Sequence, residues 1–150
     1  MNCIFFTGDG RNPCRLGADE LITAVRIPPG ANGGQAGFVK KSLRGSVDFA
    51  IATLAMGLRK NGSGRPDIRI VLNGVSTRPI RAKKAEAHLM AGGIDRKTIG
   101  RAFGLILEDI GPLSLIGASP LVRRKTIEAM FAELVEELTP NVKQNLSRRN

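Results

Sequence analysis

The sequence predicts an α+β domain, in which an antiparallel sheet of three to four strands is followed by three helices packed on one of its faces. Up to residue 73, apolar residues tend to alternate with polar ones, whereas after Pro79 they recur at helical spacing. An Asn61-Gly62 pair joins two apolar runs, which is the strongest short-range signal for a hairpin. Strands that come first and helices that follow argue against repeated strand–helix–strand units.

A first strand is predicted at residues 19–27, because every second side chain there is apolar or β-branched. The prolines that follow cannot donate to a ladder, so the strand is expected to stop before Pro28. A Gly/Asn loop at residues 30–34 then returns the chain. The residues that alternate are Leu21, Thr23, Val25 and Ile27.

A second strand is predicted at residues 36–42, with Phe38 and Lys40 on one face and Val39 and Lys41 on the other. Residues 47–58 are ambiguous, because their apolar positions fit a helical stripe as well as one face of a strand. Periodicity favours a helix there. The Asn-Gly turn favours a strand, since the run after it alternates as far as residue 72.

Three helices are predicted after Pro79 from apolar stripes bounded by capping residues. The bounding residues are Gly92-Gly93 after the first helix, Asp95 before and Gly111-Pro112 after the second, and Ser119 before and Thr139-Pro140 after the third.

The predicted α+β domain therefore spans residues 19–139. Residues 1–18 are expected to be a lead segment: a frayed end, the tail of something longer, or an edge segment that docks on another domain. Residues 140–150 are expected to be a basic flexible tail.

Composition favours a protein of the cytoplasm with acidic partners. The formal net charge is +10, which favours phosphate groups or acidic subunits as partners. The positive charge is spread along the chain and all six aromatic residues are Phe, so nucleic acid is not expected as a partner. No apolar run approaches the ~20 residues of a membrane span. Two cysteines without a metal or disulfide signature fit a reducing compartment.

The sequence contains no recognisable catalytic motif, so an enzyme that acts alone is not expected. What remains is a basic cluster made of Lys40, Lys41 and Arg44. Two interpretations of this cluster stay open: a solvated strand end, or a contact with an anion or cofactor, to which a lysine supplies a compact charge and hydrogen-bond donors.

A series of short motifs in a fixed order then suggests a family. The motifs are DELITAVRIP at 19–28, FVK at 38–40 with Arg44 after it, DFA at 48–50, IVLNGV at 70–75, Pro79, and the helical residues 82–86. In this order they resemble the C-terminal domain of the flavoprotein component of molybdenum hydroxylases. That group includes the medium subunit of carbon monoxide dehydrogenase and the FAD domains of xanthine dehydrogenase and hydroxybenzoyl-CoA reductase.

The resemblance implies an α+β sandwich in which residues 48–58 form a strand. It also implies an FAD-binding subunit that passes electrons from iron–sulfur clusters to an acceptor, with the molybdenum cofactor and the iron–sulfur clusters held by partner subunits. The flavin-contacting lysine of the family falls on Lys40 and its apolar flavin contact on Ile22. Arg44 and Asp48 are motif positions that could equally pair with each other.

Two departures from the family pattern limit what the resemblance implies. The glycine-rich FAD-binding domain is not in this sequence, so the chain alone is expected to bind FAD weakly or not at all. Val122-Arg123 stands where the family often has Tyr-Arg, so an interface contact made by that tyrosine is not expected.

The alternative function is a non-catalytic assembly module that docks acidic subunits. The substrate, the electron acceptor and a homo-oligomeric state cannot be read from these residues.

Overall fold

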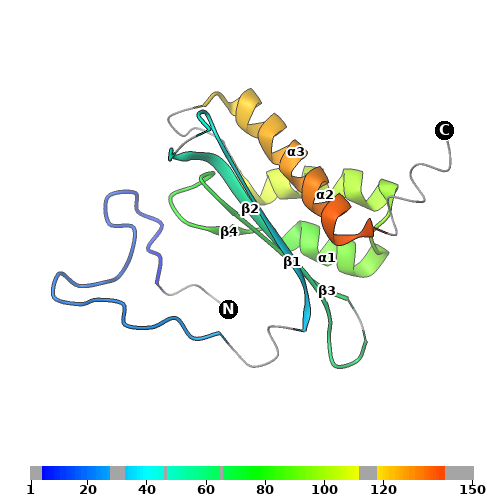
Figure 1. The fold of residues 1–150 in the computed structure, drawn as a ribbon, viewed down its shortest axis with the longest axis horizontal. Helices are drawn as coiled ribbons and strands as arrows, with labels where there is room; N and C mark the ends of the chain where they lie inside the picture. Colours follow the sequence, from blue (N-terminus) through cyan, green and yellow to red (C-terminus); the bar gives the residue numbers. More distant parts are fainter. Residues whose placement is uncertain (1–4, 28–32, 46, 65, 112–117, 141–150) are drawn as a thin grey trace.

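The structure is a computed structural model that describes residues 5–27, 33–45, 47–64, 66–111 and 118–140. Its elements in chain order are β1 (Gly34–Ser42), β2 (Ala50–Lys60), β3 (Pro66–Asn73), β4 (Ile80–Arg81), α1 (Lys83–Gly92), α2 (Arg96–Ile110) and α3 (Pro120–Leu138). The helices lie together on one side of the sheet, and the N-terminal segment runs on the other side (Figure 1). Most of the predicted loop at 30–34 and almost all of the predicted tail at 140–150 lie outside the described residues.

The four strands form one antiparallel sheet in the order β1-β2-β3-β4. In this sheet Leu54 of β2 lies between Val39 of β1 and Leu72 of β3. The hairpin between β2 and β3 closes through the Gly64 N–H, which donates to the Asn61 carbonyl over 2.8 Å. The predicted α+β class and the strand assignment for the ambiguous residues 48–58 are thus confirmed, with the strand itself starting at Ala50.

The core lies between the sheet and the helices, because every second residue of the central strands is buried. Helix α3 packs on β1 and β2, and α1 packs on β3. The buried strand residues on this side are Val39, Ala52, Leu54, Met56, Ile68, Ile70 and Leu72. None of the helices in the described residues covers the opposite face of the sheet, and we call it the open face.

The helix boundaries follow the predicted capping residues. The Asp95 side chain accepts from the backbone N–H groups of Lys97 and Thr98, and the Thr98 hydroxyl accepts from the Asp95 backbone N–H, which makes a capping box. Ser119 caps α3 and Pro120 is its first residue. All three predicted helices are confirmed.

One strand prediction is corrected by the structure, and one strand was not predicted. Residues 21–27 contain no regular structure, and their apolar side chains are 56–85% exposed. Alternation specifies a strand only when a neighbouring strand is present to pair with it, and the described residues supply no such neighbour for this segment. The fourth strand is instead β4, whose two residues are too few for a periodic signal.

A buried arginine of α3 joins the ends of two strands. Arg123 is only 2% exposed, and its Nη1 donates to the carbonyl oxygens of Ile51 and Gly74, the latter over 2.7 Å. The register between β1 and β2 shifts at this point, since Lys41 pairs with Ala52 and Ser42 with Ala50. Ile51 therefore occupies a bulge, and the guanidinium satisfies the carbonyl that the bulge exposes.

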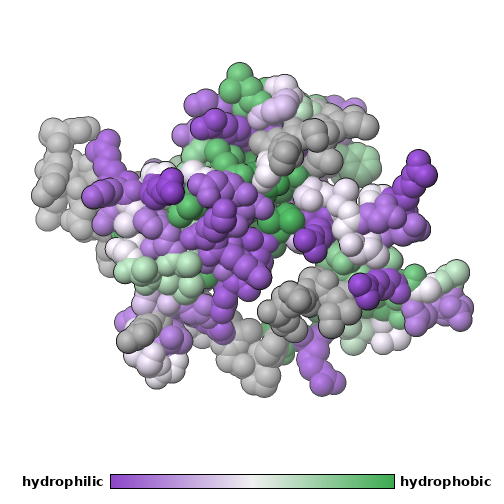
Figure 2. Space-filling view, turned by 180° about the vertical axis from the view of Figure 1, so that it is seen from behind, coloured by the Kyte–Doolittle hydropathy of each residue, from purple (hydrophilic) through white to green (hydrophobic). Residues whose placement is uncertain are grey.

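Within the described part of the chain, no helix combines the length and apolar character needed to cross a membrane. The surface seen from behind is mostly hydrophilic, with smaller hydrophobic areas between the polar ones (Figure 2).

Candidate functional site

The predicted flavin-contacting lysine, Lys40, lies on the open face of the sheet. Strand alternation places Phe38 and Lys40 on this face, opposite the side that packs on α3. The residues paired with them across the ladder are Ala55 and Thr53. An apolar ring and a cationic side chain therefore lie side by side on the open face.

The two neighbouring lysines of β1 lie in different environments. The ammonium of Lys41 forms an ion pair of 2.9 Å with the Glu133 carboxylate of α3. The Lys40 side chain is exposed and forms no hydrogen bond or ion pair with any other described residue. Of the two lysines, Lys40 is thus the one whose hydrogen-bond donors are available to a ligand.

The loop after β1 is held by an ion pair between Arg44 and Asp48, which the sequence allowed as one of two roles for these residues. Arg44 Nε donates to Asp48 Oδ2 over 3.2 Å, and the Phe49 N–H donates to Asp48 Oδ1 over 2.8 Å. The hydrogen bond from Arg44 contributes most to the lowered pKa of the Asp48 carboxyl, the Phe49 N–H adds to it, and the Lys40 charge lowers that pKa further. Arg44 and Asp48 therefore hold the strand entry together.

The second predicted contact, Ile22, lies in the N-terminal segment and is 56% exposed. This segment is attached near its start, where the Thr77 hydroxyl donates to the Gly8 carbonyl over 2.6 Å. No hydrogen bond or ion pair within the described residues joins residues 21–27 to β1. Within the described residues, no polar contact therefore holds the segment that carries Ile22 against the strand that carries Lys40.

A network of charges farther along the sheet was not predicted from the sequence. The buried carboxylate of Asp67 accepts from Arg59 Nε over 2.7 Å and lies 2.9 Å from Arg69 Nη2. Glu86 of α1 is also buried, forms a hydrogen-bonded ion pair with Arg81, and accepts from the Ile70 N–H over 2.9 Å. In a sequence, charged residues in strands indicate a solvated face. That these charged residues form ion pairs with one another depends on strand register and on the packing of α1, which only the structure gives.

Burial raises the pKa of the Asp67 carboxyl, but the hydrogen bond from Arg59 and the positive charges of Arg69 and Arg59 outweigh burial, and the pKa lies below its ordinary value of 3.8. A lowered pKa in the folded state stabilises the fold above the unfolded pKa, and this stabilisation is lost as the pH falls through the folded pKa.

We therefore expect the difference in unfolding free energy between wild type and Asp67→Asn to be constant near neutral pH and to shrink below pH 3.8. Urea unfolding of both proteins at a series of pH values measures this difference. A difference that widens in acid would contradict the assignment, and Asp19→Asn, at an exposed carboxylate of the N-terminal segment, is the control.

The fold and the open face together define a class: an α+β domain whose uncovered sheet carries an available cation. The profile of the CO dehydrogenase flavoprotein C-terminal domain matches residues 37–138, which is more than half of the chain. The chain therefore belongs to this family, whose name identifies the C-terminal domain of a flavoprotein. Lys40 lies within the match, and Ile22 lies outside it.

Curated relatives extend the similarity. The chain is 24% identical over 134 residues to the glyceraldehyde dehydrogenase medium chain of Sulfolobus acidocaldarius, covering 89% of this chain and 46% of that one. It is 35% identical over 91 residues to the aldehyde oxidoreductase FAD-binding subunit PaoB of Escherichia coli, covering 59% of this chain and 27% of that one. The chain thus spans less than half the length of either relative.

Solved structures agree with the fold. Quinoline 2-oxidoreductase from Pseudomonas putida 86 matches with a TM-score of 0.59 and 27% identity, over 73% of this chain and 38% of the other. Cu,Mo-CO dehydrogenase in its cyanide-inactivated form matches with a TM-score of 0.61 and 25% identity, over 76% of this chain and 39% of the other. These comparisons confirm the predicted architecture as that of CO dehydrogenase flavoprotein domains.

Proposed function

We propose that this domain completes the FAD site of a molybdenum-containing dehydrogenase and helps to pass electrons from iron–sulfur clusters to an acceptor. The observation that carries the proposal is the exposed Lys40 side chain on the open face, within the residues that match the family. The partners proposed with it are the FAD-binding domain or subunit, a molybdenum subunit and an iron–sulfur subunit.

The chemistry of the open face fits one side of a flavin. A flavin presents an apolar ring system edged by carbonyl oxygens, and it supplies reversible electron transfer when bound. Lys40 can donate hydrogen bonds to a ring carbonyl or a phosphate oxygen, and its charge favours electron-rich groups beside it. Ile22 is proposed to supply an apolar contact once residues 21–27 are positioned by the rest of the subunit.

Most of the FAD is proposed to be held outside this chain, by a glycine-rich domain. Support comes from length, since the medium chain relative is matched over only 46% of its residues. We therefore propose that residues 1–18 lead from that domain and that the isolated chain retains FAD weakly or not at all.

Co-expression with the flavin-domain partner tests the role of Lys40. We expect Lys40→Ala to weaken FAD retention by about tenfold, because one charge-assisted hydrogen bond is lost from a partly desolvated site. The midpoint potential of the bound flavin should also become more negative, since a nearby cation favours the form with more electrons. FAD absorbance after dialysis and a spectroelectrochemical titration measure the two effects.

The matched control is Lys41→Ala, which removes the next lysine of the same strand but from the opposite face. Loss of the exposed ion pair with Glu133 should change stability by less than about 1 kcal/mol and leave FAD retention unchanged. Equal retention and equal potential in Lys40→Ala and wild type would overturn the assignment of Lys40.

A further inference from the structure

A hollow of about 410 Å³ lies at the end of the β2–β3 hairpin, on the face of the sheet opposite to Lys40. Strand alternation explains it. The core stripe of β2 continues from buried Met56 to half-buried Leu58 and then to exposed Lys60. The sheet therefore extends past the helices that cover the core, and its last apolar residues are only partly covered.

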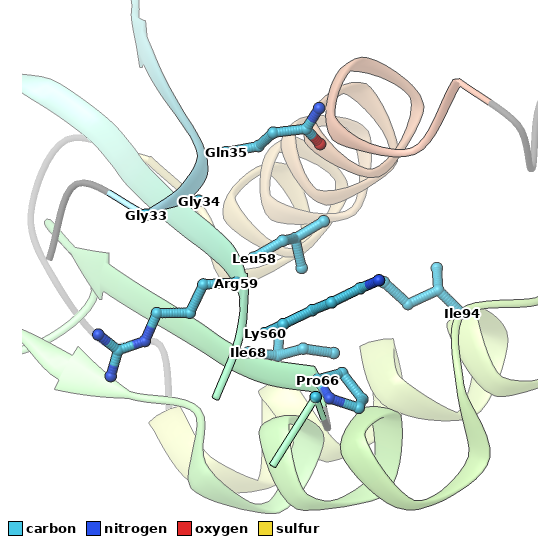
Figure 3. A pocket seen from close by; sticks show the side chains of 10 residues that line it. Gly33, Gly34, Gln35, Leu58, Arg59, Lys60, Pro66, Ile68 and Ile94 are labelled. Carbon is cyan, nitrogen blue, oxygen red and sulfur yellow. The ribbon is translucent and has the colours of Figure 1, made fainter. Parts of the chain in front are cut away.

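The lining of the hollow follows from the register of the strands. Gln35, Leu58 and Ile68 lie in one row across β1, β2 and β3, and Lys60 pairs with Pro66 in the next row. Ile94, from the connection between α1 and α2, lines the hollow from the helix side. Figure 3 shows the side chains of Leu58, Ile68 and Pro66 around one space, with Lys60 extending across it toward Ile94.

The two charged residues that line the hollow, Arg59 and Lys60, are both basic. Lys60 forms no hydrogen bond or ion pair with another described residue, and none of the ten lining residues is acidic. The second cation, Arg59, turns its guanidinium away from the hollow (Figure 3) and donates to Asp67 over 2.7 Å. One available ammonium thus lies beside Ile94, at the helix side of an open apolar hollow.

We propose that this hollow binds a small amphipathic monocarboxylate, with its apolar chain against Leu58, Ile68 and Ile94 and its carboxylate on Lys60. Small-molecule sites have volumes of about 300–1,000 Å³, a mostly apolar lining and few polar groups that fix orientation, and the hollow has these features. The net charge of +10 disfavours a second copy of this chain as the occupant.

Octanoate and 1-octanol are suitable probes, because they share an apolar chain and differ in charge. Titrated into the isotopically labelled full chain, octanoate is expected to shift amide signals of residues 57–60, 66–68 and 94. We expect it to bind about fivefold more tightly than 1-octanol, which is the typical effect of one partly exposed ion pair. Absence of saturable shifts at millimolar octanoate, or shifts centred elsewhere, would overturn the proposal.

Substitutions separate the two halves of the site. Lys60→Met keeps the aliphatic stem and should abolish the preference for octanoate over 1-octanol, while Ile94→Asn should weaken the binding of both probes. Lys83→Met, at the exposed first residue of α1, is the control and should bind both probes as wild type does. Equal octanoate affinity in Lys60→Met and Lys83→Met would contradict the role of Lys60. The isolated chain is used without FAD, so failure here leaves the proposed flavin role standing.

Discussion

Replacing Arg123 by methionine is expected to lower the free energy of unfolding by about 3 kcal/mol, since two backbone carbonyls lose a charged donor inside the protein. Those carbonyls belong to Ile51 in the bulge of β2 and to Gly74 just after β3. Methionine matches the length of the arginine stem but cannot donate a hydrogen bond. The loss should therefore reflect unsatisfied acceptors more than lost packing.

The matched control is Arg124→Met, one residue along the same helix, where the side chain is exposed. It should change stability by no more than about 0.5 kcal/mol, as most surface substitutions do. Urea unfolding of the three proteins gives the comparison, and equal midpoints for Arg123→Met and Arg124→Met would refute the structural role of Arg123. Arg123→Lys should recover part of the loss, because one ammonium cannot reproduce the planar fork of a guanidinium.

The second large effect is expected at Glu86. Glu86→Ala should also cost about 3 kcal/mol, because it leaves the Ile70 N–H without its acceptor and Arg81 without its carboxylate. The bond from Ile70 matters because it is made by a buried strand residue beside the two-residue strand β4. Thermal and urea unfolding measure the loss.

Glu108→Ala provides the contrast for Glu86. Glu108 also lies near two cations, Lys84 at 3.0 Å and Arg101 at 3.9 Å, but its side chain is 46% exposed. Its removal should cost less than about 1 kcal/mol. If both alanine variants lose the same stability, burial is not what makes the Glu86 network important.

The helices were predictable from sequence because their signals are local. Asp95 and Ser119 each bond to backbone groups two or three residues away, and a glycine follows Ile110. None of these signals needs information about distant residues. The ambiguity at residues 47–58 was of another kind, since small apolar residues fit both periods. The Asn61-Gly62 turn and the family resemblance favoured a strand there.

The wrong strand prediction at residues 19–27 has a physical cause. The residues do alternate, but a strand forms only where another strand pairs with it. The sequence pattern does not show which segments pair with which. The buried roles of Arg123 and Glu86 were also beyond sequence reasoning, because their partners lie 72 and 16 residues away along the chain. Lys40 and Ile22 as flavin contacts stay predictions.

The opposite orientations of Lys40 and Lys41 have a consequence for comparing this chain with its relatives. At identities of 24–35%, two adjacent lysines are easily exchanged by an alignment shifted by one position. Such a shift would move every side chain of β1 to the wrong face of the sheet. The pairing of Val39 with Leu54 in the core supplies the check. A correct alignment must keep an apolar residue at the position of Val39, directly before Lys40 and on the same face as Lys41.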